Sequence, residues 1–412
     1  MAMQRLLGKI LDRLIVEGRL TVRWPDGTET TYGRGPGRSA GVEIKDRASI
    51  RRLVLNPALA LGEGYMAGGI VPLDCSLFEL LDLLVANLMA GPREGTFAMR
   101  LRARLGWLFR RLMQYNPAPR ARRNAAHHYD LNGRLYSLFL DRDRQYSCAY
   151  FPHGDETIEE AQTAKKRHIA AKLLLTRPDL SVLDIGSGWG GLALTLAREH
   201  GARVLGITLS SEQLAEARAR AADAGLAGQV RFELQDYRSL EQKFDRIVSV
   251  GMFEHVGINH YPAFFAAIRR CLAPDGVALL HAIGRSDGPG VTNRWIDRYI
   301  FPGGYCPALS EVLPAIERAG LWVTDIEILR LHYAETLARW RRRFLANRDT
   351  IAALMDERFC RMWEFYLVGS ELAFRREGHM VFQIQLARSV DTVPLTRDYI
   401  FEAERRAVQS LA

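Results

Sequence analysis

The stretch "VLDIGSGWGG", Val182 to Gly191, decides the fold of this chain. Apolar residues and an aspartate lead into a glycine-rich turn, and the apolar-faced segment "GLALTLAREHGA" (191–202) follows. This pattern is typical of a buried strand that turns sharply into a helix. Glycine lets the backbone approach a ligand without a Cβ in the way, so the turn predicts a nucleotide site.

The spacing of the glycines fits two nucleotide fingerprints. Gly186, Gly188 and Gly191 spell the G-x-G-x-x-G of NAD enzymes. Asp184 with the glycines at 186, 188 and 190 spells the D-x-G-x-G-x-G of S-adenosylmethionine (SAM) methyltransferases. An NAD site needs an acidic residue about 20 positions further on, and "GITLS" (206–210) has none. This absence favours SAM, although many SAM sites also carry an acid there.

From about residue 125 onward, candidate strands alternate with helical segments. The expected strands are 181–186, 203–208, 229–234, 245–251 and 276–283. Alternation of this kind predicts an α/β fold with a doubly wound, mostly parallel sheet. Near the end, "MVFQIQLAR" (380–388) alternates apolar residues with Gln383 and Gln385, which predicts a strand of an antiparallel hairpin.

The first part of the chain predicts a smaller, mainly helical domain. Residues 1–20 form an amphipathic pattern, "LTVRWPDGTETTYG" predicts a hairpin that turns at 25–27, and "NPALALGEGYMAGG" reads as a loop and the start of a helix. A linker, "YNPAPRARRNAA", follows. We therefore expect an N-terminal membrane- or lipid-binding domain over 1–120 and a catalytic domain over 125–412.

The composition narrows the class of protein. The 412 residues are 48% hydrophobic, enough for a large core. The five cysteines form no C-x-x-C pair, which argues for a reducing cytosol and against a structural zinc site. No uncharged apolar run approaches the roughly 18 residues that a membrane-spanning helix needs.

The formal net charge of +9 is concentrated in the first third of the chain. Residues 1–129 hold 20 Lys and Arg against 11 Asp and Glu, and no acid occurs between Glu94 and Asp130. In this segment Leu101, Leu105, Leu108 and Leu112 share one helical face among arginines. Such a helix suits an anionic membrane surface, but it also suits a core-packed helix with a solvated face. The leucines and aromatic residues argue against nucleic acid.

Residues that could carry chemistry follow the predicted strands. Thr208 and Gln213 follow the second strand, Asp236 and Tyr237 the third, and Glu254 the fourth. His281 and Ile283 lie near the end of the fifth. A single glutamate in a loop or histidine on a strand is more often structural than catalytic. Their convergence on the ligand edge of one sheet predicts an active site.

A longer series of strings resembles the cyclopropane-fatty-acyl-phospholipid synthases and the related mycolic acid cyclopropane synthases. The matching strings are "HHYDLNGRLYSLFLD", "QYSCAYF", "VLDIGSGWGG", "GITLSSEQ", "LQDYRSL", "FDRIVSVGMFEHVG", "LLHAIG", "RYIFPGG" and "HYAETLARW". They run in order from His127 to Trp340. The glycine turn is common to SAM enzymes, whereas Y-S-C-A-Y and F-E-H-V-G are more specific.

The resemblance implies the Rossmann-like fold of class I SAM-dependent methyltransferases. It also implies a SAM-dependent transfer of a methyl or methylene group to the cis double bond of phospholipid acyl chains. It implies these cofactor-binding residues: Tyr146, Ser147, Asp184, Gly186, Gly188, Trp189, Gly190, Thr208, Gln213, Asp236 and Tyr237. It also implies a bicarbonate ion, held by Cys148, Glu254, His281, the backbone of Ile283 and Tyr333, as the base that removes a proton from the transferred methyl group. No metal is implied.

We expect a cytoplasmic enzyme that binds peripherally to the inner face of the membrane and has no nucleic-acid partner. A homodimer is one possible oligomeric state. An acyl-lipid C-methyltransferase that gives a methyl-branched or methylene product is the alternative. An inactive membrane-binding protein and a methyltransferase for nucleic acids or small amines are also considered, and the filled bicarbonate set argues against both. Ser187 and Ser370 stand where family members often have cysteine, so no mechanism can use a thiol at position 370. Ala282 stands where threonine is frequent.

Overall fold

The computed structural model describes residues 2–90 and 133–409. Packing divides the chain into two compact units. One comprises Met1–Leu108, Thr292–Pro302 and Leu337–Gly378, and the other comprises Phe109–Val291, Gly303–Thr336 and His379–Ala412. The domain boundary expected near 120–125 and the basic segment 95–129 lie outside the described residues.

The second unit is built on a seven-stranded sheet in the order β10-β11-β9-β8-β5-β6-β7. The strands are β5 (Ser181–Ile185), β6 (Arg203–Thr208), β7 (Val230–Leu234), β8 (Phe244–Val250), β9 (Leu272–Arg285), β10 (Trp322–Leu329) and β11 (His379–Ala387). The neighbours from β7 to β9 pair in parallel, and β11 pairs antiparallel with β9 and β10. This is the class I SAM methyltransferase fold, as predicted. The five predicted parallel strands and the antiparallel strand are confirmed, and β10 was not predicted. The antiparallel strand is not part of a hairpin, because residues 330–378 separate β11 from β10.

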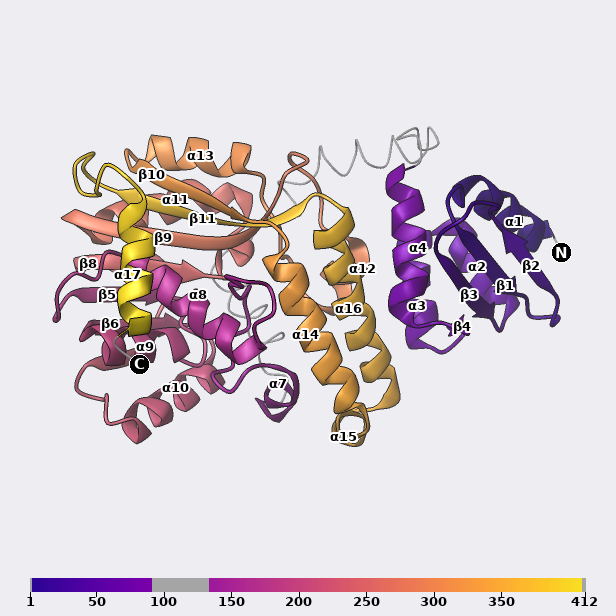
Figure 1. Cartoon of the computed structure of the whole chain (residues 1–412), viewed down its shortest axis with the longest axis horizontal. Coiled ribbons are helices and arrows are strands. Elements are labelled where there is room, and N and C mark those ends of the chain that lie inside the picture. Colours follow the sequence, from indigo (N-terminus) through magenta and orange to yellow (C-terminus); the bar gives the residue numbers. More distant parts are fainter. Residues whose placement is uncertain (1, 91–132, 410–412) are drawn as a thin grey trace. The chain divides into compact units, whose positions relative to one another are not determined.

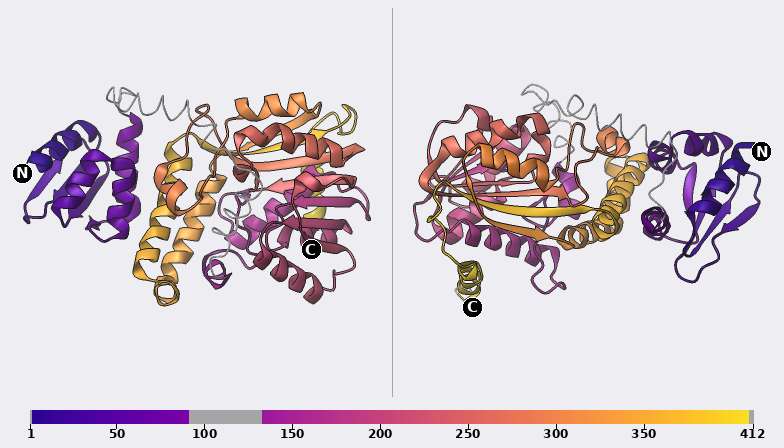
Figure 2. Two further views of the ribbon diagram at one scale, coloured as in Figure 1. Left: turned by 180° about the vertical axis from the view of Figure 1, so that it is seen from behind. Right: turned by 90° about the horizontal axis from the view of Figure 1, so that it is seen from above.

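Helices cover both faces of this sheet (Figure 1). On one face α11 (Tyr261–Cys271) and α13 (Leu309–Arg318) pack on a core that contains Phe264 and Ile316. On the other face lie α8 (Ile158–Lys172), α9 (Gly191–His200) and α10 (Ser211–Asp223), with Ile169 and Leu196 in the core. Figure 2 shows the same layers from behind and from above. This unit also contains the short helix α7 (Gly133–Phe139) and the longer helix α17 (Asp398–Gln409), which packs against α8.

The face of β11 with Gln383 and Gln385 is buried, because α8 and α17 bring polar side chains to it. Both glutamine side chains are fully buried. Gln385 donates to the backbone carbonyl of Lys172 (2.6 Å) and to the Tyr399 hydroxyl (2.7 Å). The alternation correctly predicted a strand, but its polar side does not face solvent.

The other unit contains the N-terminal region. Its four-stranded sheet has the order β2-β1-β3-β4, with β1 (Arg19–Arg23), β2 (Glu29–Tyr32), β3 (Ser39–Ile44) and β4 (Ile70–Leu73). The β1–β2 hairpin is confirmed. The helices are α1 (Ala2–Leu14), α2 (Arg47–Leu55), α3 (Pro57–Met66), α4 (Leu77–Ala90), α12 (Arg294–Tyr299), α14 (His332–Ala346, from residue 337), α15 (Arg348–Leu354) and α16 (Glu357–Arg376).

Two expectations for this region need correction. The N-terminal region combines strands with helices, so it is more mixed than the mainly helical domain predicted. The small-residue stretch 57–66 is the complete helix α3 rather than a loop and a helix start. Position 62 inside this helix requires glycine, because a Cβ there would lie 2.4 Å from Trp295 Nε1. No helix in the described parts of the chain is both long enough and apolar enough to cross a bilayer.

Candidate active site

The turn after β5 is built from three glycines in the left-handed backbone region. Gly186, Gly188 and Gly190 have φ angles of 84°, 55° and 83°. A Cβ at Gly188 would meet no atom within 4 Å, whereas a Cβ at Gly190 would lie 2.6 Å from Phe232 Cζ. Gly188 therefore borders open space where a ligand can approach the backbone, and Gly190 lets α9 pack closely on the sheet.

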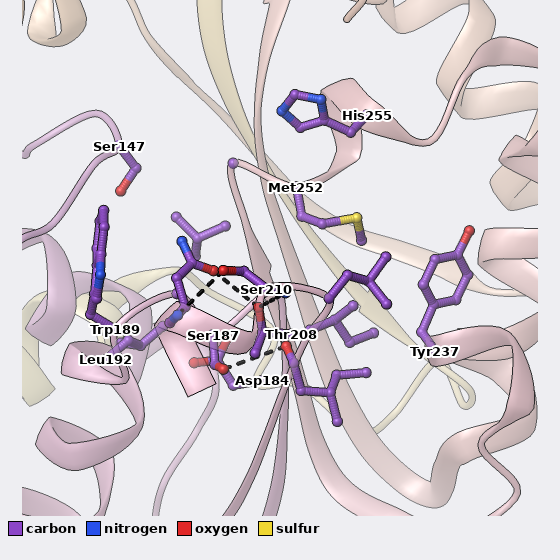
Figure 3. Close-up of a pocket in the computed structure, with 18 of the residues that line it drawn as sticks. Ser147, Asp184, Ser187, Trp189, Leu192, Thr208, Ser210, Tyr237, Met252 and His255 are labelled. Carbon is purple, nitrogen blue, oxygen red and sulfur yellow. Dashed lines mark hydrogen bonds between the residues drawn. The ribbon is translucent and has the colours of Figure 1, made fainter. Parts of the chain in front are cut away.

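A cavity lies at the carboxyl ends of β5, β6, β7 and β8 (Figure 3). This is the edge at which open α/β sheets bind ligands. Ten of the predicted cofactor-binding residues line it: Tyr146, Ser147, Asp184, Gly186, Gly188, Trp189, Thr208, Gln213, Asp236 and Tyr237. The remaining one, Gly190, does not, in keeping with its packing role.

Asp184 is the acidic residue of the glycine turn and is only 2% exposed. Its Oδ2 has no hydrogen-bond partner among the described residues. Burial raises the pKa of Asp184 to about 7, and the nearby Lys165 ammonium opposes that rise. A buried carboxyl oxygen without a donor is unfavourable, so a ligand that donates a hydrogen bond here would stabilise the site.

The second and third strands end in polar groups that already contact one another. Thr208 Oγ1 donates to Gln213 Oε1 at 3.0 Å, and both residues are buried. Asp236 begins a short 3-10 turn, η1 (Tyr237–Ser239), and its carboxylate accepts two bonds from the Arg238 guanidinium at 2.9 and 2.7 Å. The Asp236 carboxylate is therefore neutralised within the protein, and Tyr237 packs edge-on against Phe264.

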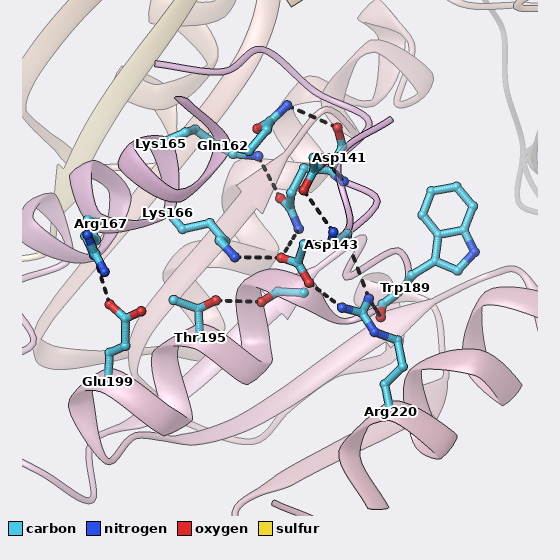
Figure 4. A network of polar contacts seen from close by, with 12 residues as sticks. Asp141, Asp143, Gln162, Lys165, Lys166, Arg167, Trp189, Thr195, Glu199 and Arg220 are labelled. Carbon is cyan, nitrogen blue, oxygen red and sulfur yellow. Dashed lines mark hydrogen bonds and ion pairs between the residues drawn. The ribbon is translucent and has the colours of Figure 1, made fainter. Parts of the chain in front are cut away.

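The segment before the Y-S-C string is held against the glycine turn by a charged network (Figure 4). The Asp143 carboxylate pairs with Lys166 at 2.6 Å and with Arg220. Arg220 also donates to the Trp189 carbonyl at 2.6 Å. Because Trp189 belongs to the glycine turn, Arg220 joins the turn directly to the segment that carries Tyr146.

Two further residues of this region, on α8, were missed in the sequence. Lys165 Nζ donates to Gln145 Oε1 (2.7 Å) and Ser147 Oγ (2.9 Å), and Gln162 Nε2 donates to the Ser147 carbonyl (3.0 Å). Lys165 is 1% exposed, and burial lowers the pKa of its ammonium to about 8. The sequence feature that could have identified them is a predicted helix that packs on the sheet although it carries polar residues where apolar ones are expected.

Glu254 and Ile283 are in direct contact. Glu254 lies in the 3-10 turn η2 (Phe253–His255) after β8, and its Oε1 accepts a bond from the Ile283 N–H at 2.5 Å. Glu254 Oε2 is buried and has no hydrogen-bond partner in the described structure. Burial raises the pKa of Glu254 to about 7, opposed by the Ile283 N–H, which favours the carboxylate.

His281 lies on β9, two residues before Ile283 and beside Val250 of β8. Its Nδ1 lies 3.1 Å from the Gln383 side-chain amide. Burial lowers the pKa of His281 well below its usual range, with smaller contributions from Lys165, Lys172 and His168. The ring is therefore neutral at physiological pH.

The segments that carry Cys148 and Tyr333 are joined by hydrogen bonds between neighbouring residues. The Ala149 N–H donates to Thr336 Oγ1 at 3.0 Å, and Thr336 follows Tyr333 by one helical turn in α14. The Phe151 N–H donates to His332 Nδ1 at 3.0 Å, which adds a second tie to the same turn. Burial raises the pKa of the Cys148 thiol, so it stays protonated and can act only as a weak donor.

The five predicted catalytic residues do not line the cofactor cavity. Two of them are sequence neighbours of residues that line it. Cys148 follows Ser147, and Glu254 precedes His255. Electrostatic contacts of Lys165 reach Cys148 and His281, as well as Asp184 in the cavity wall. Lys165 thus connects the cavity electrostatically with two of the predicted catalytic residues. That all five form one anion site stays a prediction.

Comparison with protein families identifies relatives of both parts of the chain. Residues 117–384 match the family described as mycolic acid cyclopropane synthetase. Residues 6–89 match a domain of unknown function.

Individual relatives agree with the family match. The cyclopropane-fatty-acyl-phospholipid synthase of Escherichia coli (strain K12) is 37% identical over 354 residues, 85% of this chain and 89% of the relative. The tuberculostearic acid methyltransferase UfaA1 of Mycobacterium tuberculosis is 36% identical over 402 residues, 93% of this chain and 91% of the relative. A crystal structure of mycolic acid cyclopropane synthase CmaA1 complexed with SAH and CTAB is 33% identical with a TM-score of 0.62, and covers 66% of this chain and 99% of its own.

Proposed function

The chain belongs to the mycolic acid cyclopropane synthetase family, and on that premise we propose that it forms cyclopropane rings on unsaturated acyl chains of phospholipids. It is a SAM-dependent methyltransferase of the cyclopropane fatty acid synthase type. One observation carries the finer proposal. A buried acid, Glu254, keeps one oxygen free of hydrogen bonds among the described residues and lies next in sequence to the cavity wall.

The residues around the glycine turn fit the cofactor. SAM, when bound, supplies the methyl group. Gly188 leaves room for it at the backbone, and the unbonded Asp184 Oδ2 can accept a hydrogen bond from its amino group. The buried pair of Thr208 and Gln213 stands where an acid would otherwise bind the ribose. Tyr146 and Ser147 line the cavity from the segment that Lys165 and Arg220 hold in position.

The catalytic residues fit a small anion that carries one hydroxyl group. Bicarbonate, when bound, would supply the base that removes a proton from the transferred methyl group. Glu254 Oε2 can accept its hydroxyl. The Cys148 S–H donates to the Ala149 carbonyl at 3.2 Å in this structure, so the thiol would have to exchange that partner for the ion, and the Tyr333 hydroxyl is the other donor of the predicted set. His281 is neutral and therefore can donate from only one ring nitrogen. The low polarity around these buried groups would strengthen each of these bonds.

A methyl-branched or methylene product is the second candidate. It is favoured by the name of the tuberculostearic acid methyltransferase, a relative that this chain matches along 93% of its length. Both reactions begin with the same methyl transfer and differ in the fate of the carbocation. Loss of a proton from the transferred methyl group, with the cation still on the adjacent chain carbon, permits ring closure. If a hydride first shifts to that cation, loss of a methyl proton gives a methylene group instead, and loss of a proton from a neighbouring chain carbon gives a methyl-branched alkene.

Turnover on lipid vesicles tests the proposal. The purified full-length protein is incubated with methyl-labelled SAM and vesicles of monounsaturated phosphatidylglycerol, with saturated vesicles as the matched control. We expect label in the acyl chains of the unsaturated lipid alone. Proton NMR of the product then separates the candidates, because cyclopropane methylene protons resonate upfield of other aliphatic protons. Vinylidene or branched-methyl signals would refute ring formation, and label in neither lipid would refute the lipid substrate.

The basic segment 95–129 supports a peripheral location at the inner face of the membrane. It contains eight arginines and no acid. Each Lys or Arg near an anionic surface contributes about 1 kcal/mol to binding, so even half of these arginines could hold the protein there. The substrate itself lies in a bilayer, and surface binding would bring the enzyme to it without a spanning helix.

A further inference from the structure

A continuous series of polar side chains leads from helix α17 to His281; Gln383, Lys172 and His168 are buried, and Glu327 and Glu404 are partly exposed. Gln383 on β11 lies directly opposite His281 on β9 in the antiparallel register, and both are almost completely buried. Gln383 Oε1 lies 2.7 Å from Lys172 Nζ, and Lys172 forms an ion pair with Glu327. Beyond it, His168 connects Glu327 to Glu404 of α17 with contacts of 2.6 Å on each ring nitrogen.

The contacts of Lys172 determine the orientation of the Gln383 amide. Lys172 is 0% exposed, pairs with Glu327 and lies 3.8 Å from Asp325 Oδ2. Burial lowers the pKa of Lys172. The Glu327 carboxylate opposes this shift and so favours the protonated ammonium form of Lys172. An ammonium group has only donors, so it must face the amide oxygen of Gln383 and not its NH₂ group.

The amide orientation in turn determines which nitrogen of His281 carries the proton. With Oε1 facing Lys172, Gln383 Nε2 is the atom that lies 3.1 Å from His281 Nδ1. The NH₂ group is a donor, so Nδ1 must accept and cannot carry a proton. In a neutral imidazole the proton must then be on Nε2.

We propose that Gln383, oriented by Lys172, is a positioning residue that holds His281 in its Nε2–H tautomer. The His281 ring is then a hydrogen-bond donor through Nε2 and has no lone pair there with which to take a proton. This deepens and rests on the proposed function, because it leaves proton removal to the anion and gives His281 the role of orienting it. Catalytic sites commonly contain a residue that fixes a histidine tautomer by bonding to the ring nitrogen that does not face the ligand.

Three substitutions separate this role from simple packing. Gln383→Glu replaces the donor with a carboxylate, which accepts from Lys172 and draws a proton onto His281 Nδ1. Gln383→Met removes the amide and leaves the tautomer unspecified. Gln385→Met is the matched control, because Gln385 is equally buried on the same face of β11 but bonds to Lys172 O and Tyr399 instead of to His281.

The measurement is nitrogen-15 NMR of the histidine rings in the ligand-free full-length protein, with the His281 signals identified by their loss in His281→Asn. We expect a protonated Nε2 and an unprotonated Nδ1 from pH 6 to 8 in the wild type and in Gln385→Met. Gln383→Glu should place a proton on Nδ1, and Gln383→Met should give a mixture of tautomers. Turnover in Gln383→Glu should fall by about 100-fold or more, while SAM affinity stays within about twofold.

An Nδ1–H tautomer or an imidazolium ring in the wild type would overturn the proposal. So would an unchanged tautomer in both Gln383 variants, or an equal shift in Gln385→Met. Because the tautomer is read without lipid, SAM or bicarbonate, its failure is distinguishable from failure of the lipid activity. The His281 tautomer can be as proposed even if the product carries no ring.

Discussion

Glu254→Gln should make the protein more stable at alkaline pH while it abolishes most of the activity. The carboxyl group is 7% exposed, has one oxygen bonded to the Ile283 N–H, and has no partner for the other among the described residues. A glutamine of the same shape can still accept from the Ile283 N–H, but it never ionises. The substitution therefore removes a buried charge and keeps the local geometry.

The magnitude follows from the raised pKa. Burial takes the pKa of Glu254 from 4.5 to about 7. At roughly 1.4 kcal/mol per pKa unit, ionising this group in the folded protein costs up to about 3 kcal/mol. Because the folded-state pKa is the higher one, the stabilisation is fully present below pH 4.5 and is lost as the pH rises through about 7. The free energy of unfolding of Glu254→Gln, relative to that of the wild type, should therefore increase little at pH 5 and most at pH 8.

Calorimetric melting of the full-length protein at pH 5, 6.5 and 8 measures this difference. We expect the melting temperature of Glu254→Gln relative to wild type to rise by several degrees between pH 5 and pH 8, with turnover reduced by about 100-fold or more. Glu371→Gln is the matched control, since Glu371 is also buried but pairs with Arg341 (3.0 Å) and Arg375 (2.9 Å). That variant should be destabilised at every pH. A constant or falling difference for Glu254→Gln would refute the reasoning.

The other predictions concern the cofactor, the anion and the membrane. Gly188→Val should reduce SAM affinity in calorimetry by at least about 10-fold, whereas Gly225→Val, with a similar φ of 69° and open space around its Cβ, should leave it unchanged. Stripping bicarbonate with degassed buffer should lower turnover and its return should restore it; indifference to bicarbonate would exclude the ion. Glutamine at five arginines of the basic segment should weaken binding to anionic vesicles by roughly 30- to 150-fold, most strongly at low salt, if about half of them engage. These five are Arg100, Arg102, Arg104, Arg110 and Arg111. The matched control replaces five arginines that are exposed elsewhere and should have little effect: Arg203, Arg231, Arg298, Arg397 and Arg406.

The parallel sheet and the glycine turn could be predicted because their signals are local. Apolar runs of strand length, separated by helical segments, are sufficient to predict a βαβ arrangement. The separate roles of Gly188 and Gly190 could not be predicted, because they depend on Phe232, which comes more than 40 residues later and lies against only one of the two. Spacing identifies glycines, but packing decides which of them borders the ligand.

The buried polar face of β11 illustrates a second limit. Alternation of apolar and polar residues specifies two faces of a strand but not what covers each face. The pattern places Gln383 and Gln385 on one face but does not show that this face is buried against Lys172 of α8, more than 200 residues away in the sequence. Buried polar groups of this kind pair with one another across the fold, so their partners appear only in three dimensions.

Asp184 Oδ2 and Glu254 Oε2 are buried carboxyl oxygens without a hydrogen-bond partner among the described residues, and they connect the stability of the fold to its chemistry. Each belongs to a buried acid with a pKa of about 7, and each is therefore unfavourable in the ligand-free protein. A ligand that donates a hydrogen bond to either oxygen offsets part of the free-energy cost of burying it. If the proposed function holds, these two positions would favour the amino group of SAM and a hydroxyl-bearing anion as ligands, and replacing either acid with its amide should stabilise the fold at the expense of the reaction.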